Sequence, residues 1–156
     1  MGLLLDKSVV VTGGGGGIGR ATCLVLAEAG ARLVVSDVAV ANGEETVQLV
    51  KDAGGEAIFV AADLASEAQI EALVAAAVKA YGRLDGAFNN AGVEQCNKPL
   101  ADLSLAEWQR AINIDLTAVF LCMKYEIKAM LQNGGGSIVN TASSLGQVGL
   151  AGASEY

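Results

Sequence analysis

The fold of this chain is decided by SVVVTGGGGGIGR at residues 8–20. The β-branched residues 9–11 predict a short buried strand, the five glycines cannot continue it, and residues 18–29 are predicted to form a helix. Glycines let a backbone approach a diphosphate closely, and the free N–H groups at a helix N-terminus supply donors and partial positive charge. Glycine runs also occur in flexible linkers, but the flanking strand and helix argue against that alternative. The stretch therefore predicts a strand, a turn and a helix arranged to bind an anionic ligand.

The alternation of strand and helix continues along the chain. Further strands are predicted at residues 31–37, 56–61, 84–89 and 136–140, and helices at 43–53, at 66–81 with Ser66 as the cap, and at 104–131. Loops are expected at 39–43, 63–66 and 92–103. Apolar strands that alternate with helices are typical of a parallel sheet covered on both faces. We predict an α/β fold with a three-layer, doubly wound Rossmann-type sheet of strand order 3-2-1-4-5, as a single domain over residues 1–156.

Composition excludes several function classes. The 156 residues carry a net charge of −7, which opposes general binding to nucleic acid or anionic lipid. No apolar run is long enough to span a membrane, and residues 1–6 are too short for a signal peptide, so we expect a soluble cytoplasmic protein. The three cysteines (Cys23, Cys96 and Cys122) have neither disulfide-framework nor zinc-site spacing, and no metal is predicted.

Three motifs follow one another in a distinctive order. Thr12-Gly13-x-x-x-Gly17-Ile18-Gly19 comes first, Asn89-Asn90-Ala91-Gly92 follows, and Ser143 and Tyr156 come last, 13 residues apart. With these motifs the whole chain resembles the short-chain dehydrogenase/reductase family. The resemblance implies an oxidoreductase that transfers hydride between a nicotinamide cofactor and an alcohol or ketone.

The resemblance also implies roles for individual residues. Those expected to bind the cofactor, besides Asp37, are Gly13, Gly16, Gly17, Ile18, Gly19, Asp63, Leu64, Asn90, Ala91 and Gly92. Ser143 would hydrogen-bond the substrate oxygen, and Tyr156 would act as general acid/base. A phenol is almost entirely neutral at neutral pH, so such a tyrosine needs positive charge nearby. In the family, a lysine four residues after the tyrosine and the oxidised nicotinamide supply it.

Asp37 predicts which nicotinamide cofactor is used. It closes the second predicted strand, 18 residues after Gly19, where a carboxylate accepts hydrogen bonds from ribose hydroxyls and repels a 2′-phosphate. No basic residue precedes Gly17 in the glycine turn, and Val38 rather than arginine follows Asp37. NAD(H) is therefore favoured over NADP(H). The alternative is a solvated aspartate at a strand end.

Two features depart from the family pattern. Asp115 and Ala118 stand where the family usually has asparagine and glycine, and Asn113 lies about 200° away from Asp115 around an α-helix. Asn113 therefore cannot simply substitute, and Asp115 is the third candidate catalytic residue, which could take the family role if that role rests on a backbone carbonyl that holds a water. The sequence also stops at Tyr156, before the family lysine, so the sheet is expected to be incomplete at its C-terminal side. The alternative function is therefore a truncated, inactive nucleotide-binding or oligomerisation module. By analogy, the 104–131 helix is the expected homo-oligomer contact.

Overall fold

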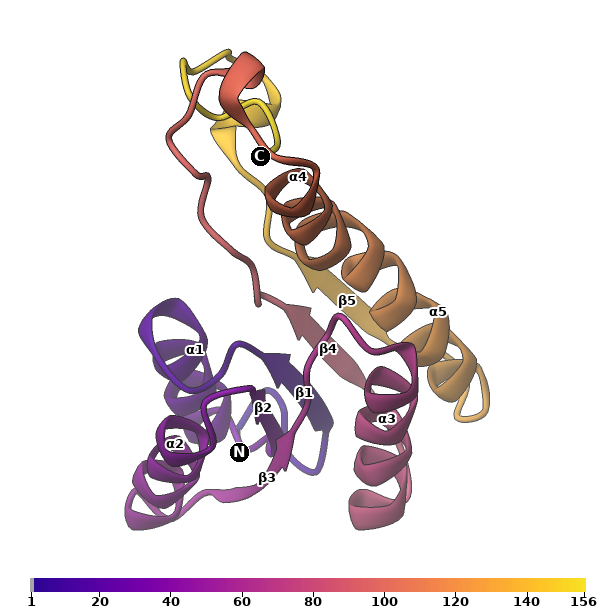
Figure 1. Cartoon of the computed structure of the whole chain (residues 1–156). Helices are drawn as coiled ribbons and strands as arrows, with labels where there is room; N and C mark the ends of the chain where they lie inside the picture. Colours follow the sequence, from indigo (N-terminus) through magenta and orange to yellow (C-terminus); the bar gives the residue numbers. More distant parts are fainter. Residues whose placement is uncertain (1) are drawn as a thin grey trace.

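Five parallel strands form the centre of the computed structural model, which describes residues 2–156 (Figure 1). They are β1 (Ser8–Thr12), β2 (Arg32–Asp37), β3 (Glu56–Ala61), β4 (Gly86–Asn89) and β5 (Ser137–Asn140). Their order in the sheet is β3-β2-β1-β4-β5, and every neighbouring pair is parallel. The predicted fold class and strand order are confirmed.

The helices follow the strands as expected, with some differences at their ends. They are α1 (Gly17–Glu28), α2 (Val40–Asp52), α3 (Glu67–Tyr81), α4 (Leu105–Ala111) and α5 (Ala118–Leu131), with short 3-10 turns η1 (Leu100–Asp102) and η3 (Ser144–Gly146). The predicted loop at 39–43 is wrong, because Asp37 Oδ1 accepts the Ala39 N–H and the chain turns directly into α2. The Ser66 side chain does not cap α3 either. Its backbone carbonyl instead accepts the N–H groups of Gln69 and Ile70.

Alternation along the two central strands creates a core on each face of the sheet. Val9 and Val11 of β1 pack in a cluster with Cys23 of α1 and Val47 of α2. Val10 points to the other face, where it joins a cluster from α3 and α5 that includes Ile70, Leu73, Cys122 and Met130. Figure 1 shows the resulting three layers, with α1 and α2 on one side and α3 and α5 on the other. Alternate residues of one strand therefore pack against the helices on opposite faces of the sheet.

The two edges of the sheet are less covered than its centre. All five residues of β1 are buried, whereas β5 has three exposed residues and one partly buried residue. β5 pairs only with β4. The expectation that every strand is covered on both faces is therefore wrong for β5.

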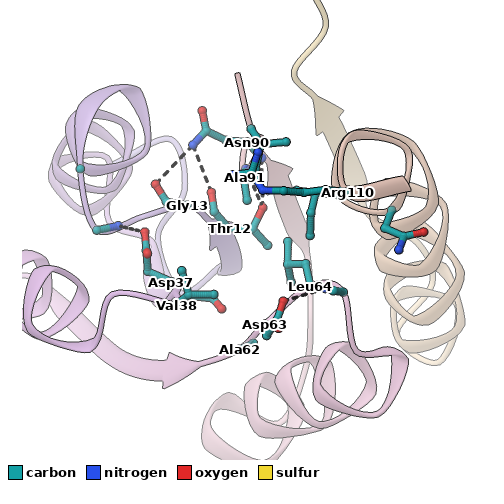
Figure 2. Close-up of a pocket in the computed structure, with 18 of the residues that line it drawn as sticks. Thr12, Gly13, Asp37, Val38, Ala62, Asp63, Leu64, Asn90, Ala91 and Arg110 are labelled. Carbon is teal, nitrogen blue, oxygen red and sulfur yellow. Dashed lines mark hydrogen bonds between the residues drawn. The ribbon is translucent and has the colours of Figure 1, made fainter. Parts of the chain in front are cut away.

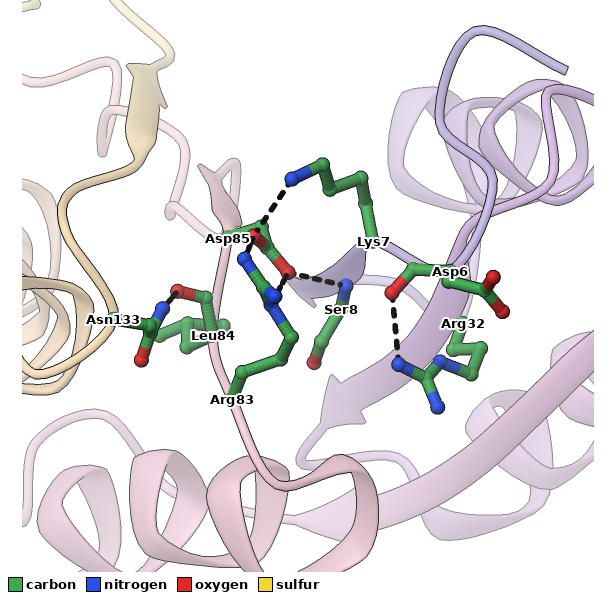
Figure 3. Close-up of polar contacts among 8 residues, drawn as sticks. All are labelled: Asp6, Lys7, Ser8, Arg32, Arg83, Leu84, Asp85 and Asn133. Atoms are coloured by element: carbon green, nitrogen blue, oxygen red, sulfur yellow. Dashed lines mark hydrogen bonds and ion pairs between the residues drawn. The ribbon is translucent and has the colours of Figure 1, made fainter.

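A carboxylate joins the amino ends of β1 and β4 (Figure 3). Asp85 accepts hydrogen bonds from the Ser8 N–H at 3.1 Å, from Lys7 at 3.1 Å and from two nitrogens of Arg83 at 2.5 and 2.8 Å. Burial by itself would raise the pKa of Asp85, but the bonds from Arg83, Ser8 and Lys7 together outweigh burial and lower it. Because the cluster lies at the amino ends of the strands, the opposite edge is left free for a ligand site.

Candidate functional site

A cleft of about 930 Å³ opens at the carboxyl ends of the strands (Figure 2). This is the edge where ligands bind in open α/β sheets. Eight of the residues predicted from the sequence line it together: Gly13, Gly16, Asp37, Asp63, Leu64, Asn90, Ala91 and Gly92. The opposite wall comes from α4 and the helical turn after it, through Gln109, Arg110 and Asn113. The cleft is within the size range of small-molecule sites.

The glycines of the β1–α1 turn have different tasks. Gly13 has φ of +64°, and an added Cβ would lie 2.9 Å from Cα of Ala91. A Cβ on Gly19 would lie 2.1 Å from the carbonyl oxygen of Gly13, so this glycine permits helix α1 to pack against the turn. Gly16 has extended backbone, and an added Cβ would meet nothing within 4 Å. Packing therefore requires Gly13 and Gly19, whereas at Gly16 the protein leaves open space beside the cleft.

The start of α1 has no side-chain cap. Gly16 is its N-cap residue, the first turn contains no acidic side chain, and Gly17 and Ile18 follow at the exposed end without lining the cleft. The N–H groups of a first helical turn have no partner within the helix, and they attract anions. This helix end is therefore suited to a phosphate group.

Asp37 is tied to the glycine turn. Its Oδ2 accepts the Gly15 N–H and its Oδ1 accepts the Ala39 N–H, both at 2.9 Å. A carboxylate has about four acceptor positions, so these two bonds leave capacity for ligand hydroxyls. Arg20 supports the same turn, because its guanidinium donates to the Gly15 carbonyl at 2.6 Å and to Thr46 Oγ1 at 3.0 Å. Sequence reasoning missed Arg20, although it directly follows the glycine motif.

The residues after β4 are fastened to the end of β1. The N–H groups of Asn90 and Ala91 donate to Thr12 Oγ1 at 3.0 and 3.2 Å. The Asn90 amide also donates to the carbonyls of Thr12 and Gly13, at 3.1 and 3.3 Å (Figure 2). Asp63 lies across the cleft at the end of β3, where its Oδ1 accepts the Ala65 N–H at 2.9 Å and forms a tight turn. These bonds fix the walls of the cleft.

The predicted helix at 104–131 is not a continuous α-helix. A π-helical segment, η2 (Ile112–Thr117), separates α4 from α5. Within it, Asp115 Oδ1 accepts the Val93 N–H at 2.8 Å, and burial raises the pKa of Asp115 despite this bond. Asp115 does not line the cleft, but Asn113 does. The two residues therefore lie on different sides of the segment, in agreement with the angle of about 200° expected between them.

Ser143 and Tyr156 do not line the cleft. Ser143 is half-buried, and its Oγ accepts the Leu145 N–H at 3.2 Å at the start of η3. Tyr156 is 46% exposed. Its neighbour Glu155 is buried and accepts the Cys96 N–H at 2.5 Å, which attaches the last residues to the loop after β4. Ser143 and Tyr156 thus both follow the carboxyl end of β5, but neither side chain forms part of the cleft wall.

The described residues offer neither a metal site nor a membrane-spanning helix. Within residues 2–156, no group of three or more Cys, Asp and Glu side chains is arranged to hold a metal ion. In the same residues, no helix combines the length and the apolar character needed to cross a membrane. All three cysteines are free, and burial raises the pKa of Cys23 and of Cys122 to about 12.

Known proteins match the chain over almost its whole length. The short chain dehydrogenase family model matches residues 7–156. The 2,5-dichloro-2,5-cyclohexadiene-1,4-diol dehydrogenase of Sphingobium indicum is 47% identical over 154 residues, covering 98% of this chain and 60% of the relative. The cyclohexanol dehydrogenase of an Acinetobacter species is 40% identical over 151 residues, covering 97% and 60%.

A solved structure agrees with these relatives. The crystal structure of an NAD+-bound xylitol dehydrogenase superposes with a TM-score of 0.95 at 33% identity, covering 99% of this chain and 59% of the other. The chain spans about 60% of the length of the curated relatives that it matches. With the family model matched from Lys7 to Tyr156, this chain belongs to the short-chain dehydrogenase family.

Proposed function

We propose that the chain forms the nucleotide-binding part of an NAD-dependent oxidoreductase that interconverts an alcohol and a ketone. The observation that carries this proposal is the cleft itself, in which an uncapped helix start, the open space at Gly16 and the Asp37 carboxylate face one ligand volume. A dinucleotide presents a diphosphate and two ribose groups, and these are the complements of a helix N-terminus and a carboxylate.

The residues of the cleft fit the cofactor. The amides of the glycine turn would hold the diphosphate, together with those of Gly17, Ile18 and Gly19 at the start of α1, which follow the cleft-lining Gly16. Asp37 would accept the hydroxyls of the adenosine ribose, and Asp63 and Leu64 would flank the adenine. The wall at Asn90, Ala91 and Gly92 would face the rest of the dinucleotide. Asp37 would repel a 2′-phosphate, and this supports NAD over NADP.

For the chemical step, we propose that Tyr156 is the general base that accepts the proton of the substrate hydroxyl. The bound nicotinamide supplies the hydride acceptor. The ionised Tyr156 oxygen would take the proton of the substrate alcohol and become a neutral phenol, and Ser143 would hydrogen-bond the same substrate oxygen. Asp115 would hold the loop at Val93 beside the cofactor. An ionised tyrosine needs a nearby cation, and the family lysine four residues later would supply it in a longer chain.

The names of the relatives favour one substrate class. Two of them are named as dehydrogenases of a cyclohexadienediol and of cyclohexanol. We therefore propose a secondary alcohol on a six-membered ring as the substrate.

A homo-oligomer contact through the 104–131 helix is supported by its exposed side. Leu116, Phe120, Ile127 and Leu131 recur at spacings of four, seven and four residues, and are 48–71% exposed. Such spacing places them along one side of a helix, and apolar stripes of this kind are buried in helix pairs.

Calorimetric titration of the 156-residue protein with NADH and with NADPH tests the cofactor assignment. We expect binding of NADH, weaker binding of NADPH, and a smaller difference between the two in Asp37→Ala. Absence of heat with both nucleotides would refute the proposal. The second candidate function, nucleotide binding without catalysis, is favoured by the position of Ser143 and Tyr156 outside the cleft lining. Turnover of cyclohexanol by a chain extended to the length of the relatives, and its loss in Tyr156→Phe, would exclude it.

A further inference from the structure

A buried carboxyl lies where the ends of two central strands meet. Glu126 of α5 is 1% exposed, and its Oε2 accepts a hydrogen bond of 3.0 Å from Nδ2 of Asn89, the last residue of β4. The same Nδ2 donates to Oδ1 of Asn140, the last residue of β5, at 2.9 Å. One side-chain amide thus connects a helix with the exits of two strands.

The carboxyl ends of β4 and β5, called their exits here, are followed closely by candidate functional residues. Asn90, next to Asn89, lines the cleft, and Ser143 comes three residues after Asn140. The backbone confirms that the two exits are coupled, because the Thr141 N–H donates to the carbonyl of Asn89 at 2.9 Å. A shift of the Asn89 side chain would therefore displace both the residues after β4 and those after β5.

Among residues 2–156, no cation pairs with Glu126. Its hydrogen-bond partner is an amide, and β4 and β5 contain no charged residue. From α3, the residues in the shared cluster are apolar apart from Tyr81, and Glu67 is paired with Lys124 and Tyr125 on the exposed side. Burial raises the pKa of Glu126 to about 7, against the opposing effect of the Asn89 bond. The titratable neighbour on the same helix is Cys122, whose pKa is raised to about 12 by burial and by Glu126.

The side-chain oxygen of Asn89 accepts no hydrogen bond from the described part of the chain. This Oδ1 atom is buried and finds no hydrogen-bond partner within residues 2–156. A protonated carboxyl has an O–H to donate, whereas an ionised carboxylate has none. Leaving a buried acceptor unpaired is costly, and a protonated Glu126 carboxyl, which already accepts a bond from the same amide, would supply the missing donor, whereas an ionised one could only accept.

We propose that Glu126 is a positioning residue, whose protonated carboxyl pairs with the Asn89 side chain and holds the exits of β4 and β5 in place. The consequence for ligand binding, which acts through Asn90 and Ser143, rests on the proposed function. The pairing of Glu126 with Asn89 is independent of the proposed function. Ionisation of Glu126 above neutral pH removes the donor and loosens both segments.

Carboxyl and amide NMR titration of the ligand-free protein tests the pairing. We expect the Glu126 carboxyl to titrate near neutrality, and the backbone amide signals of Asn90 and Ser143 to shift with the same midpoint. In Glu126→Gln, which is neutral and keeps both a donor and an acceptor, these shifts should vanish. Titration of Glu126 in the ordinary range of a carboxyl, or amide shifts that persist in the Gln variant, would overturn the proposal.

NADH titrations below and above neutral pH test the consequence. We expect wild-type affinity to fall by about tenfold between about pH 5.5 and about pH 8.5, which is the equivalent of one lost hydrogen bond. Glu126→Gln should keep the affinity of the wild type at low pH across this range. The same pH profile in both proteins would overturn the positioning role. If NADH binds to neither protein, the proposed function fails, and the NMR titration still decides whether the pair exists.

Discussion

Replacing Gly16 with alanine separates the requirements of the fold from those of the ligand. The backbone of Gly16 has φ of −163° and ψ of 179°, an extended conformation that alanine adopts without strain, and the new Cβ would meet no protein atom within 4 Å. A glycine-to-alanine change at a compatible site stabilises a protein by about 0.4–1 kcal/mol through the unfolded state. Alanine is a poorer N-cap than glycine by a similar amount. We expect the free energy of unfolding to change by less than about 0.5 kcal/mol.

The Cβ of Gly16→Ala is expected to weaken ligand binding, although it leaves the fold unchanged. Gly16 lines the cleft at the start of α1, so the Cβ would occupy the space that we assign to the diphosphate. A displaced diphosphate loses at least one charge-assisted hydrogen bond, worth about 1.5–3 kcal/mol. NADH affinity should therefore fall by roughly 10- to 100-fold.

Urea denaturation and NADH fluorescence titration measure the two effects on the same samples. Gly149→Ala is the matched control, because its Cβ also meets nothing within 4 Å but lies outside the cleft. NADH affinity should remain at the wild-type value in that variant, while the free energy of unfolding should rise by up to about 1 kcal/mol because no N-cap is lost there. Gly19→Ala should instead lose folding stability, because its Cβ would lie 2.1 Å from a backbone oxygen. Unchanged NADH affinity in a stable Gly16→Ala protein would refute the assignment of this space to the cofactor.

Three further predictions concern stability and assembly. Asp85→Asn should lower the free energy of unfolding at neutral pH by about 1 kcal/mol, since it weakens a partly buried hydrogen-bonded cluster. Because the pKa of Asp85 is lowered, wild-type urea midpoints should approach those of the variant as the pH falls through that pKa. Glu126 has a raised pKa, so the wild type should lose up to about 3 kcal/mol as the pH rises from about 4.3, the usual value for an unfolded glutamate, to about 7. Urea midpoints of Glu126→Gln should stay flat over that interval, and a parallel fall would contradict the raised pKa. Phe120→Glu, which charges the exposed stripe of α5, should convert an oligomer to monomers in sedimentation velocity, whereas an unchanged sedimentation coefficient would place the contact elsewhere.

Much of the fold was predictable from local patterns. The apolar runs at Val9–Val11 and Leu33–Val35 are short and bounded by glycine or polar residues, and both form buried strands. Their alternation with amphipathic helices leaves few topologies, because parallel crossovers are right-handed. The strand order follows from this rule. The convergence of Asp37, Asp63 and Asn90 at one edge follows as well, since Asp37 ends one parallel strand and the other two come one or two residues after the ends of theirs.

The details that local patterns missed depend on partners far away in the chain. The π-helical turn contains Asp115, whose carboxylate reaches the Val93 N–H, 22 residues away. Arg20 fastens the glycine turn to α2 through Thr46, 26 residues away. Periodicity within one helix carries no information on such contacts. The roles assigned to Ser143 and Tyr156 likewise stay predictions.

The sequence by itself determined the strands, their order and the edge at which the cleft opens, because short-range periodicity and chain handedness control these features. Only the tertiary structure decided which glycines are required by packing, which side chains form the far wall of the cleft, and that Glu126 is buried against Asn89 without a cation. The physical reason is that desolvation and steric exclusion depend on every atom nearby in space, whereas a local pattern includes only neighbours along the chain.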